Sequence, residues 1–348
     1  KVGRLDNFFA LGGDSILSLQ IISRAHQAGL KLTPRQLFQH PTLEQLSRVA
    51  QATSSATTAS QERVSGPVPL TPIQHWFFDW ALPSAHHFNQ AFMLEVRQPL
   101  SPEVIEKALH LLCEHHDALR MRFTRGAATP EAQPRWLQDN AAQLTPLSLH
   151  QVDVSHLPEA QQPQAIASEA ARLQASMRLE DGDLVRAALF LRGHGLSPRL
   201  LLAIHHLVVD AVSWRFLLED LHSCCLALSQ GLTPVLPPKT TSFQSWARRL
   251  HSHALSDALA REASFWTAQP WHSVHPLPRD NATGDNTLAS ARHLTVSLSP
   301  DETRLLLHET PTAWRARIND VLLAALAQSF HAWTGHSALA VSLEGHGR

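Results

Sequence analysis

Residues 204–210 read Ile204-His205-His206-Leu207-Val208-Val209-Asp210, and this run joins two apolar segments of different pattern. The segment before it, residues 200–204, is continuously apolar, as expected of a buried strand. The segment after it, residues 212–228, carries its apolar residues at helical spacing. The run therefore predicts a buried strand that turns into a helix. Such a strand end is a rigid place from which to direct a side chain at a substrate.

Two roles are open for the histidines of this run. Histidine suits proton transfer because its pKa lies near neutral, so His206 is a candidate acid or base. The alternative is a pair of structural histidines whose ring nitrogens are satisfied within the fold. Asp210 has two roles open as well. It orients the loop through a buried ion pair, or it caps the helix that follows.

The segments around this run alternate between helical and strand patterns. Residues 102–116 predict an amphipathic helix. Its expected buried stripe consists of Val104, Ile105, Ala108, Leu111 and Leu112. Residues 184–191 predict a second buried strand, residues 318–330 another apolar helix, and residues 338–343 a last strand. This alternation predicts a mixed α/β sandwich over residues 67–348.

Residues 1–50 have a helical pattern instead. Gly-Gly-Asp-Ser at residues 12–15 enters an apolar-periodic helix, for which Gly29 is the expected end. Thr33 and Thr42 are expected to open two more short helices. Ser15 lies at a helix N-terminus, which favours an anion, so it either carries a phosphate ester or simply caps the helix. Residues 51–66 are small and polar, as in a linker.

Composition limits the class of protein. The chain has 348 residues, of which 44% are hydrophobic and 17% charged, and a net charge of -1. This balance gives no reason to expect nucleic acid or an anionic membrane as a partner. No apolar run approaches the roughly 20 residues of a membrane span, and the start does not resemble a signal peptide. Because the start also lacks an initiator Met, we expect a piece of a longer protein.

The cysteines do not predict a disulfide, and the histidines do not predict a metal site. The chain has three cysteines, Cys113, Cys224 and Cys225, and the last two are adjacent in sequence. An odd number with an adjacent pair favours reduced thiols in a cytoplasmic location over a disulfide framework. The 23 histidines are scattered, and no HExxH or CxxC pattern accompanies them. We therefore expect no metal site.

The N-terminal pattern closely resembles the peptidyl carrier proteins of nonribosomal peptide synthetases. The matching stretches are Asp-Asn-Phe-Phe at residues 6–9, Gly-Gly-Asp-Ser at 12–15, Leu-Phe at 37–38 and His-Pro-Thr at 40–42. The resemblance implies that Ser15 carries covalent 4′-phosphopantetheine, which holds an aminoacyl or peptidyl group as a thioester. It covers residues 1–50, a partial carrier whose first helix would precede Lys1. In this family, Gly-Gly-Asp-Ser is typical of carriers that feed an epimerization domain.

Residues 67–348 resemble the condensation-domain superfamily, which is built like chloramphenicol acetyltransferase, and within it the epimerization branch. The blocks are Pro-Ile-Gln-His-Trp-Phe at residues 72–77, His-Phe-Asn-Gln at 87–90, His-His-Asp-Ala-Leu-Arg at 115–120, the His-His-Leu-Val-Val-Asp run with its extension at 205–221, Asp-Val-Leu-Leu-Ala-Ala-Leu at 320–326 and Glu-Gly-His-Gly-Arg at 344–348. Six blocks in order are more specific than any one of them. Ala211 replaces the usual glycine, a mild departure.

The resemblance implies an α+β chain. We expect a partial carrier helical bundle at residues 1–50, a linker at 51–66, and an epimerization domain at 67–348 that stops at its EGHGR motif. That domain would comprise an N-terminal lobe and the start of a C-terminal lobe. Because the family domain continues beyond this motif, we expect the 348-residue chain itself to be weakly active or inactive.

The implied reaction is an isomerisation at the α-carbon of a carrier-bound L-aminoacyl or peptidyl thioester. The thioester acidifies the α-C–H bond, one group removes the proton, and another returns it on the opposite face. We assign Glu344 as the proton carrier and His206 as either the group that stabilises the enolate or the second acid/base group, with either residue as the one that removes the proton. Burial would raise the pKa of Glu344 from the roughly 4.3 of a free Glu toward neutral. His205 and Asp210 are expected to be structural, with Arg348 as a candidate partner of Asp210.

Two other functions compete with epimerization. A condensation domain, which forms a peptide bond between carrier-bound substrates, shares the HHxxxD core but would lack the blocks at residues 72–77 and 344–348. A non-catalytic carrier-docking module is the third possibility. The expected partners are the carrier-bound thioester, an upstream adenylation domain and a downstream condensation domain of the same assembly line.

Overall fold

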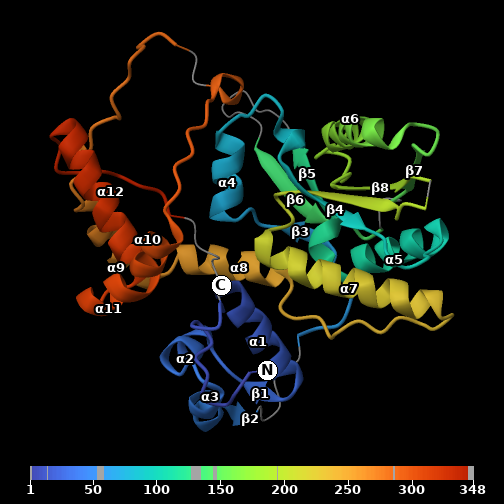
Figure 1. Ribbon diagram of the computed structural model, residues 1–348, viewed down its shortest axis with the longest axis horizontal. Coiled ribbons are helices and arrows are strands. Elements are labelled where there is room, and N and C mark those ends of the chain that lie inside the picture. Colours follow the sequence, from blue (N-terminus) through green and yellow to red (C-terminus); the bar gives the residue numbers. More distant parts are fainter. Residues whose placement is uncertain are drawn as a thin grey trace. The chain divides into compact units, whose positions relative to one another are not determined.

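The computed structural model describes residues 2–13, 15–52, 59–126, 135–143, 147–193, 195–284 and 287–343 (Figure 1). The chain divides into two compact units, residues 1–256 and 257–348. The first unit contains the N-terminal helices and both larger sheets, and the second unit is helical.

Three short helices make up the N-terminal region, as predicted. They are α1 (Ser15–Gln27), α2 (Pro34–Gln39) and α3 (Leu43–Val49). Thr33 and Thr42 cap α2 and α3, because each side-chain oxygen accepts a hydrogen bond from the third residue of its helix. Gly29 follows α1 with a φ of 79°, which confirms the predicted glycine end. The sequence did not predict the small antiparallel pair of β1 (Leu30–Lys31) and β2 (Gln51–Ala52).

A four-stranded sheet forms the centre of the first unit. Its strands run in the order β4 (Asn89–Glu95), β9 (Arg199–His205), β8 (Val185–Leu191) and β7 (Leu149–Asp153). β7 pairs with β8 in parallel, and the other neighbours pair antiparallel. All but the first residue of β9 are buried, which explains its uninterrupted apolar run. Both predicted strands are confirmed to within one residue at each end.

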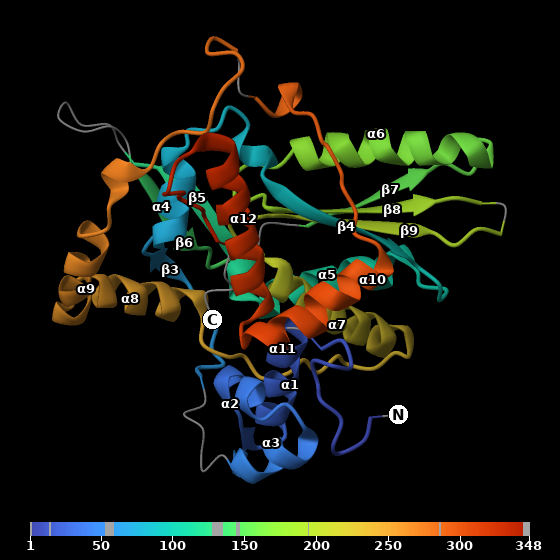
Figure 2. The ribbon, with the colours of Figure 1, turned by 60° about the vertical axis from the view of Figure 1, so that its left-hand side comes forward.

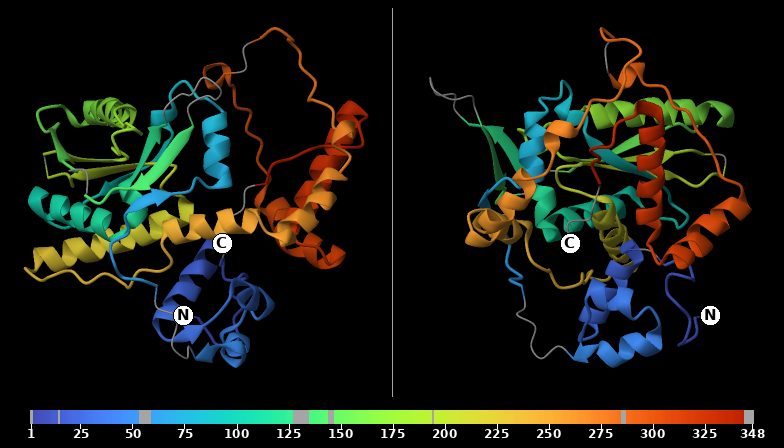
Figure 3. Two further views of the ribbon diagram at one scale, coloured as in Figure 1. Left: turned by 180° about the vertical axis from the view of Figure 1, so that it is seen from behind. Right: turned by 90° about the vertical axis from the view of Figure 1, so that its left-hand side faces the viewer.

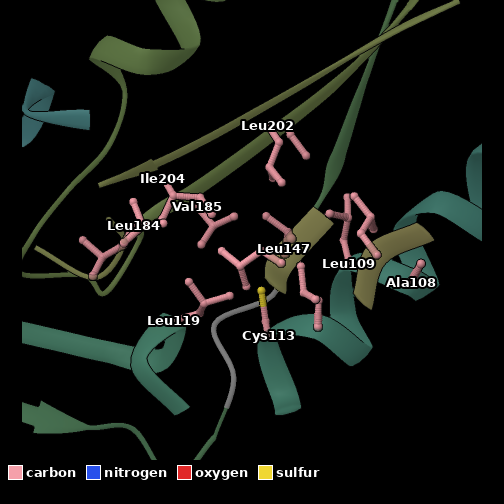
Figure 4. Close-up of a cluster of buried hydrophobic side chains, with 14 of the residues drawn as sticks. Ala108, Leu109, Cys113, Leu119, Leu147, Leu184, Val185, Leu202 and Ile204 are labelled. Atoms are coloured by element: carbon pink, nitrogen blue, oxygen red, sulfur yellow. The ribbon is translucent and has the colours of Figure 1, made fainter. Parts of the chain in front are cut away.

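Helices cover both faces of this sheet, as Figure 2 shows. On one face, α6 (Gln162–Ala175) packs Ile166 and Leu173 with Phe190 of β8. On the other face, α5 (Pro102–His115) and α7 (Ala211–Ser229) enclose the larger core. Figure 4 shows part of that core, where Leu202 and Ile204 of β9 lie with Cys113 of α5. The predicted α/β sandwich is confirmed.

The buried stripe of α5 lies about one position away from the predicted one. The buried residues are Ile105, Ala108, Leu109, Leu112 and Cys113, whereas the predicted Val104 and Leu111 are only half-buried. The reason is that α5 contacts α7 as well as the sheet, so its buried face is turned toward Leu109 and Cys113. Burial raises the pKa of the Cys113 thiol to about 12. All three cysteines are free and buried, which fits the predicted reduced thiols.

A three-stranded antiparallel sheet completes the first unit. Its order is β3 (Gly66–Val68), β6 (Trp136–Asn140) and β5 (Met121–Arg125). α4 (Pro72–Asp79) lies beside it, as Figure 3 shows, and Phe78 stacks on Trp136 with 4.5 Å between ring centroids. α8 (Phe243–Ala254) reaches it through Gln244, whose amide donates to the carbonyl oxygen of Pro67. The short 3-10 helices of this unit are η1 (Ala85–His87), η2 (Asp117–Arg120) and η3 (Glu159–Gln161).

The second unit is helical, and Phe330 is the only buried hydrophobic side chain among its described residues. Its elements are α9 (Asp257–Thr267), η4 (Trp271–Ser273), η5 (Leu288–Ser290), α10 (Pro300–Arg304), η6 (Leu305–Glu309), α11 (Thr310–Trp314) and α12 (Ile318–Thr334). α12 confirms the predicted helix at residues 318–330. The strand predicted at residues 338–343 is wrong, because no described strand pairs with this segment to share its backbone hydrogen bonds.

Within the described parts of the chain, no helix combines the length and the apolar character needed to cross a membrane.

A buried ion cluster ties residues 62–64 to the larger core. Arg120 is fully buried and donates to Asp117 Oδ1 and to the carbonyl oxygens of Val64 and Glu114. Lys239 Nζ lies 3.2 Å from the same Asp117 oxygen. The carboxylate therefore has two cations beside it, and each charge is paired.

β9 ends in a second buried polar group. His205 is 0% exposed, its Nε2 lies 2.8 Å from the carbonyl oxygen of Ala85, and its Nδ1 accepts from the backbone N–H of Leu207. A carbonyl can only accept, so Nε2 carries the proton and the ring is neutral with both nitrogens occupied. Burial is the main cause that lowers the pKa of His205 to about 4.

We expect Arg120→Leu to lower the free energy of unfolding of the first unit by about 3–5 kcal/mol, because it leaves a buried carboxylate with one cation fewer. Urea denaturation followed by circular dichroism measures the change. The control is Arg172→Ala, which removes an exposed partner of Glu169 and should cost less than about 1 kcal/mol. Equal losses in the two variants would contradict the assignment of Arg120 as a buried clamp.

We also expect the first unit to lose stability as the pH falls from about 6.5 to about 4. The unfolded chain protonates His205 near 6.5, whereas the folded chain does so only near 4, so acid favours the unfolded state. This one group contributes a slope of about 1.4 kcal/mol per pH unit in that window. Urea midpoints measured from pH 4 to pH 8 should depend less on pH in His205→Gln. The exposed-residue control His156→Gln should retain the wild-type dependence.

Candidate functional site

The candidate site lies at the turn between β9 and α7, where the sequence predicted it. His206 follows the last residue of β9, and its backbone N–H donates to the carbonyl oxygen of Phe88 over 2.8 Å. The ring of His206 stacks on the ring of Phe88, with 5.2 Å between centroids and 18° between planes. Backbone and ring are therefore held by the same neighbouring residue.

The hydrogen bonds of His206 define its tautomer. Nδ1 lies 2.8 Å from the carbonyl oxygen of Val209, which can only accept, so Nδ1 carries a proton. In the neutral ring Nε2 then carries the in-plane lone pair, and it lies 3.2 Å from Nε2 of Gln90, within hydrogen-bond distance. The side chain is half-buried. His206 can thus present a basic nitrogen, which the fully buried and fully bonded His205 cannot.

Asp210 caps α7. Its Oδ1 accepts from the backbone N–H and from the hydroxyl of Ser213, both over 2.7 Å. This is one of the two roles that the sequence left open for it, and it fixes where the helix begins. The predicted site residues Glu344 and Arg348 lie outside the described residues, so the roles assigned to them stay predictions.

The turn after His206 is held from α4. Gln74 Nε2 donates to the carbonyl oxygen of Leu207 over 3.5 Å and to Gln138 Oε1 over 2.7 Å. Gln74 is buried, and its own Oε1 accepts from the backbone N–H of Thr71. The block at residues 72–77 therefore contributes a positioning side chain to the site.

Two further residues of the site lie in sequence blocks quoted above, at residues 87–90 and 205–221, but the sequence assigned them no role. Gln90 of β4 reaches His206, and Trp214 of α7 donates from Nε1 to Gln90 Oε1 over 2.8 Å. A signal was present for each of them. Gln90 is a polar residue next to the apolar run 91–94, and Trp214 is an indole four residues after Asp210. Only the tertiary structure shows that Gln90, Trp214 and His206 meet.

The start of α1 fits a phosphate ester on Ser15. Ser15 is the first residue of a 13-residue helix, whose N-terminus favours an anion. The loop before it is tight: Gly12 has a φ of +89°, and a Cβ on Gly13 would lie 2.5 Å from the ring of Phe8. Asn7 Oδ1 accepts from the backbone N–H groups of Phe9 and Ala10. Asp14 lies outside the described residues.

Polar contacts join α1 to α7. Arg24 Nη2 lies 2.9 Å from Glu219 Oε1, and Arg215 Nη1 donates to Gln20 Oε1 over 3.3 Å. The side chains of the ion pair are 69% and 49% exposed, so the pair contributes about 0–1 kcal/mol at most. The helix that begins at Ser15 thus contacts the helix that begins after Asp210.

One group among the described side chains could hold a metal ion. His115, His116 and Asp220 have ligand atoms within 4.8 Å of one another. His116 Nε2 already lies 2.8 Å from Asp220 Oδ2, and this contact joins α5 to α7. Burial lowers the pKa of His115, and electrostatic repulsion from His116 lowers it further.

Comparison with protein families agrees with the two-part organisation. The phosphopantetheine attachment site family matches residues 2–50, and the condensation domain family matches residues 64–348. A chondramide synthase of Chondromyces crocatus is 45% identical over all of this chain, which spans 9% of that protein. Tyrocidine synthase 1 of Brevibacillus parabrevis is 38% identical, and the chain spans 31% of it. The chain thus spans a small part of these curated relatives.

Solved structures share the fold. The epimerization domain from the third module of tyrocidine synthetase B has a TM-score of 0.68 and 34% identity, over 80% of this chain and 61% of that one. The first condensation domain of the calcium-dependent antibiotic synthetase has a TM-score of 0.53 and 23% identity, over 78% of this chain and 62% of that one. The chain therefore belongs to the condensation-domain family of nonribosomal peptide synthetases, with a phosphopantetheine attachment domain ahead of its condensation-type domain.

Proposed function

We propose that the condensation-type domain of this chain is an epimerization domain. It would act on the α-carbon of an aminoacyl or peptidyl thioester held by 4′-phosphopantetheine on Ser15. The observation that carries the proposal is the basic Nε2 of His206 at a rigid strand end. The 34% identity to a solved epimerization domain supports the proposal, as do the blocks at residues 72–77 and 344–348.

Epimerization at the α-carbon requires two proton-transferring groups and no redox step. His206 has the right form for one of them, since a neutral imidazole accepts a proton near neutral pH. Glu344 is our candidate for the second, on the opposite side of the α-carbon. The phosphopantetheine arm supplies the thioester linkage, which makes the α-C–H bond acidic and brings the substrate to the site. Hydrogen-bond donors around the thioester oxygen would stabilise the enolate that forms between the two transfers.

The fixed neighbours of His206 explain how the ring would work. Val209 holds the Nδ1 proton and Phe88 supports the ring face, so Nε2 points in one direction before the substrate arrives. Such preorganisation lowers the barrier because no side chain has to be ordered during proton transfer. His205 and Asp210 act indirectly in this scheme, by packing the strand end and by starting α7.

The contacts between α1 and α7 support delivery of the thioester from the carrier within this chain. An upstream adenylation domain would load that carrier, and a downstream condensation domain would receive the epimerized group. A condensation domain remains the competing function, because it shares the strand-end histidine.

We expect His206→Ala to slow α-proton exchange of the carrier-bound substrate by about 10²–10⁴-fold, because it removes the acid–base group. Glu344→Gln should produce a loss of similar size. The measurement is deuterium loss from an [α-²H]aminoacyl thioester loaded on Ser15, with His156→Gln as the matched surface control. It is run with this chain and with a protein in which the sequence continues past Arg348.

Unchanged exchange in both variants would rule out this site. Formation of an amide with an added acceptor thioester, without exchange, would instead favour a condensation domain.

We expect Ser15→Ala to abolish attachment of phosphopantetheine by a phosphopantetheinyl transferase, since the hydroxyl is the only group assigned to carry it. Intact-protein mass spectrometry measures the modification. Ser18→Ala, a change one turn further along α1, is the control and should still be modified. Modification that persists in Ser15→Ala would place the attachment elsewhere.

A further inference from the structure

The amide of Gln90 has a fixed orientation. Trp214 Nε1–H can only donate, and it lies 2.8 Å from Gln90 Oε1, so the oxygen faces the indole. Trp214 is 2% exposed, and Phe92 packs on it with 4.7 Å between ring centroids. The indole therefore has little freedom to turn. It follows that the NH₂ group of Gln90 faces His206.

This orientation makes Gln90 selective for one protonation state of His206. An amide NH₂ donates and does not accept, so its 3.2 Å contact with His206 Nε2 is a hydrogen bond only while that nitrogen has a lone pair. Protonation of Nε2 would set two donors against each other. A flip of the amide would relieve this clash, but it would turn the NH₂ group toward the indole N–H and lose the bond to Trp214.

Val209 binds the other ring nitrogen of His206, Nδ1. The Val209 carbonyl accepts a hydrogen bond from Nδ1–H. In the opposite tautomer, with the proton on Nε2, the neutral ring would lose the hydrogen bonds to both Gln90 and Val209. We infer that Trp214 and Gln90 are positioning residues that hold His206 as the neutral Nδ1–H tautomer, so that His206 meets the substrate as a proton acceptor. This inference rests on the proposed function for its catalytic meaning, and it goes further by assigning His206 the first proton transfer.

The step balances without a further reactant. The α-C–H bond breaks, a bond from His206 Nε2 to that proton forms, and the electron pair stays on the substrate as the enolate. Once Nε2 is protonated, it can no longer accept the hydrogen bond from Gln90. The contacts of Trp214 and Gln90 that favour the neutral ring of His206 therefore also favour release of the proton from the imidazolium.

Few titratable groups lie around His206 among the described residues. His205 precedes it on β9 and is neutral through its bonds to Ala85 and Leu207. His86 of η1 acts electrostatically on His205; its Nδ1 accepts from the backbone N–H of Leu179 and lies 3.7 Å from Glu180 Oε2. Asp210 lies at the start of α7, and its Oδ1 is bonded to Ser213. From α4, the uncharged side chains of Phe77 and Gln74 contact the residues on either side of His206, namely the His205 ring and the Leu207 carbonyl oxygen.

The test is a ring titration of His206 by nuclear magnetic resonance in the 348-residue chain with ¹⁵N-labelled histidine. The His206→Ala spectrum assigns the signal among the 23 histidines. Wild-type protein at neutral pH should show the Nδ1–H tautomer. Gln90→Glu, which places an acceptor opposite Nε2, should move the titration midpoint to higher pH by about 1–3 units. Trp214→Phe, which does not touch His206, should move it in the same direction by less.

Trp76→Phe is the matched control, an exposed tryptophan of α4, and it should leave the midpoint unchanged. Circular dichroism identifies variants that fail to fold, and Gln90→Glu nearly preserves size and shape. An Nε2–H tautomer in the wild type, or equal midpoints in wild type and folded Gln90→Glu, would overturn the inference. Because the titration needs no substrate, its outcome is independent of the exchange assay. Where exchange is measurable, Gln90→Glu should shift the acid limb of its pH–rate profile by the same amount.

Discussion

The candidate site depends on the register in which β4 pairs with β9. Asn89 lies opposite His205 and Gln90 opposite Ile204, so Phe88 and Gln90 come to the two sides of His206. A slip of one residue would turn Gln90 to the other face of the sheet and separate it from Trp214. Two contacts of β4 oppose such a slip: Leu94 packs against the larger core, and the ring of Phe92 packs on Trp214 of α7. These contacts therefore position the neighbours of His206, our candidate for proton transfer.

The two neighbouring histidines show how environment divides chemistry between identical side chains. His205 is buried and uses both nitrogens on backbone groups, which makes it a structural residue sensitive to acid. His206 lies one residue further, past the end of the strand; its Nδ1 bonds to the carbonyl oxygen of Val209, and its Nε2 lies 3.2 Å from the side-chain nitrogen of Gln90. The end of the strand explains the difference, because His206 lies beyond the buried positions of β9 and is only half-buried.

The sequence predicted most of the fold and only part of the site. Apolar runs located β8 and β9, and the threonine caps located α2 and α3, because these signals are local. The stripe of α5 was misplaced because α7, far away in the chain, also packs against this helix and turns its buried face. The strand at residues 338–343 was wrong because apolar residues alone do not supply a pairing partner. Gln90 and Trp214 are 124 residues apart, so only tertiary structure could show that they form one relay with His206.

The weakness of the contacts between α1 and α7 has a kinetic consequence. Both helices belong to one chain, so the carrier meets its partner surface at an effective concentration that tethering can raise to the millimolar range. At such a concentration, an exposed ion pair and the two hydrogen bonds of Gln20 to Arg215 and Glu219 are enough to populate the encounter. Under the proposed function, a stronger contact would lengthen the time that the carrier spends there and slow its release. The exposure of Arg24 and Glu219 thus fits a surface that favours turnover over occupancy.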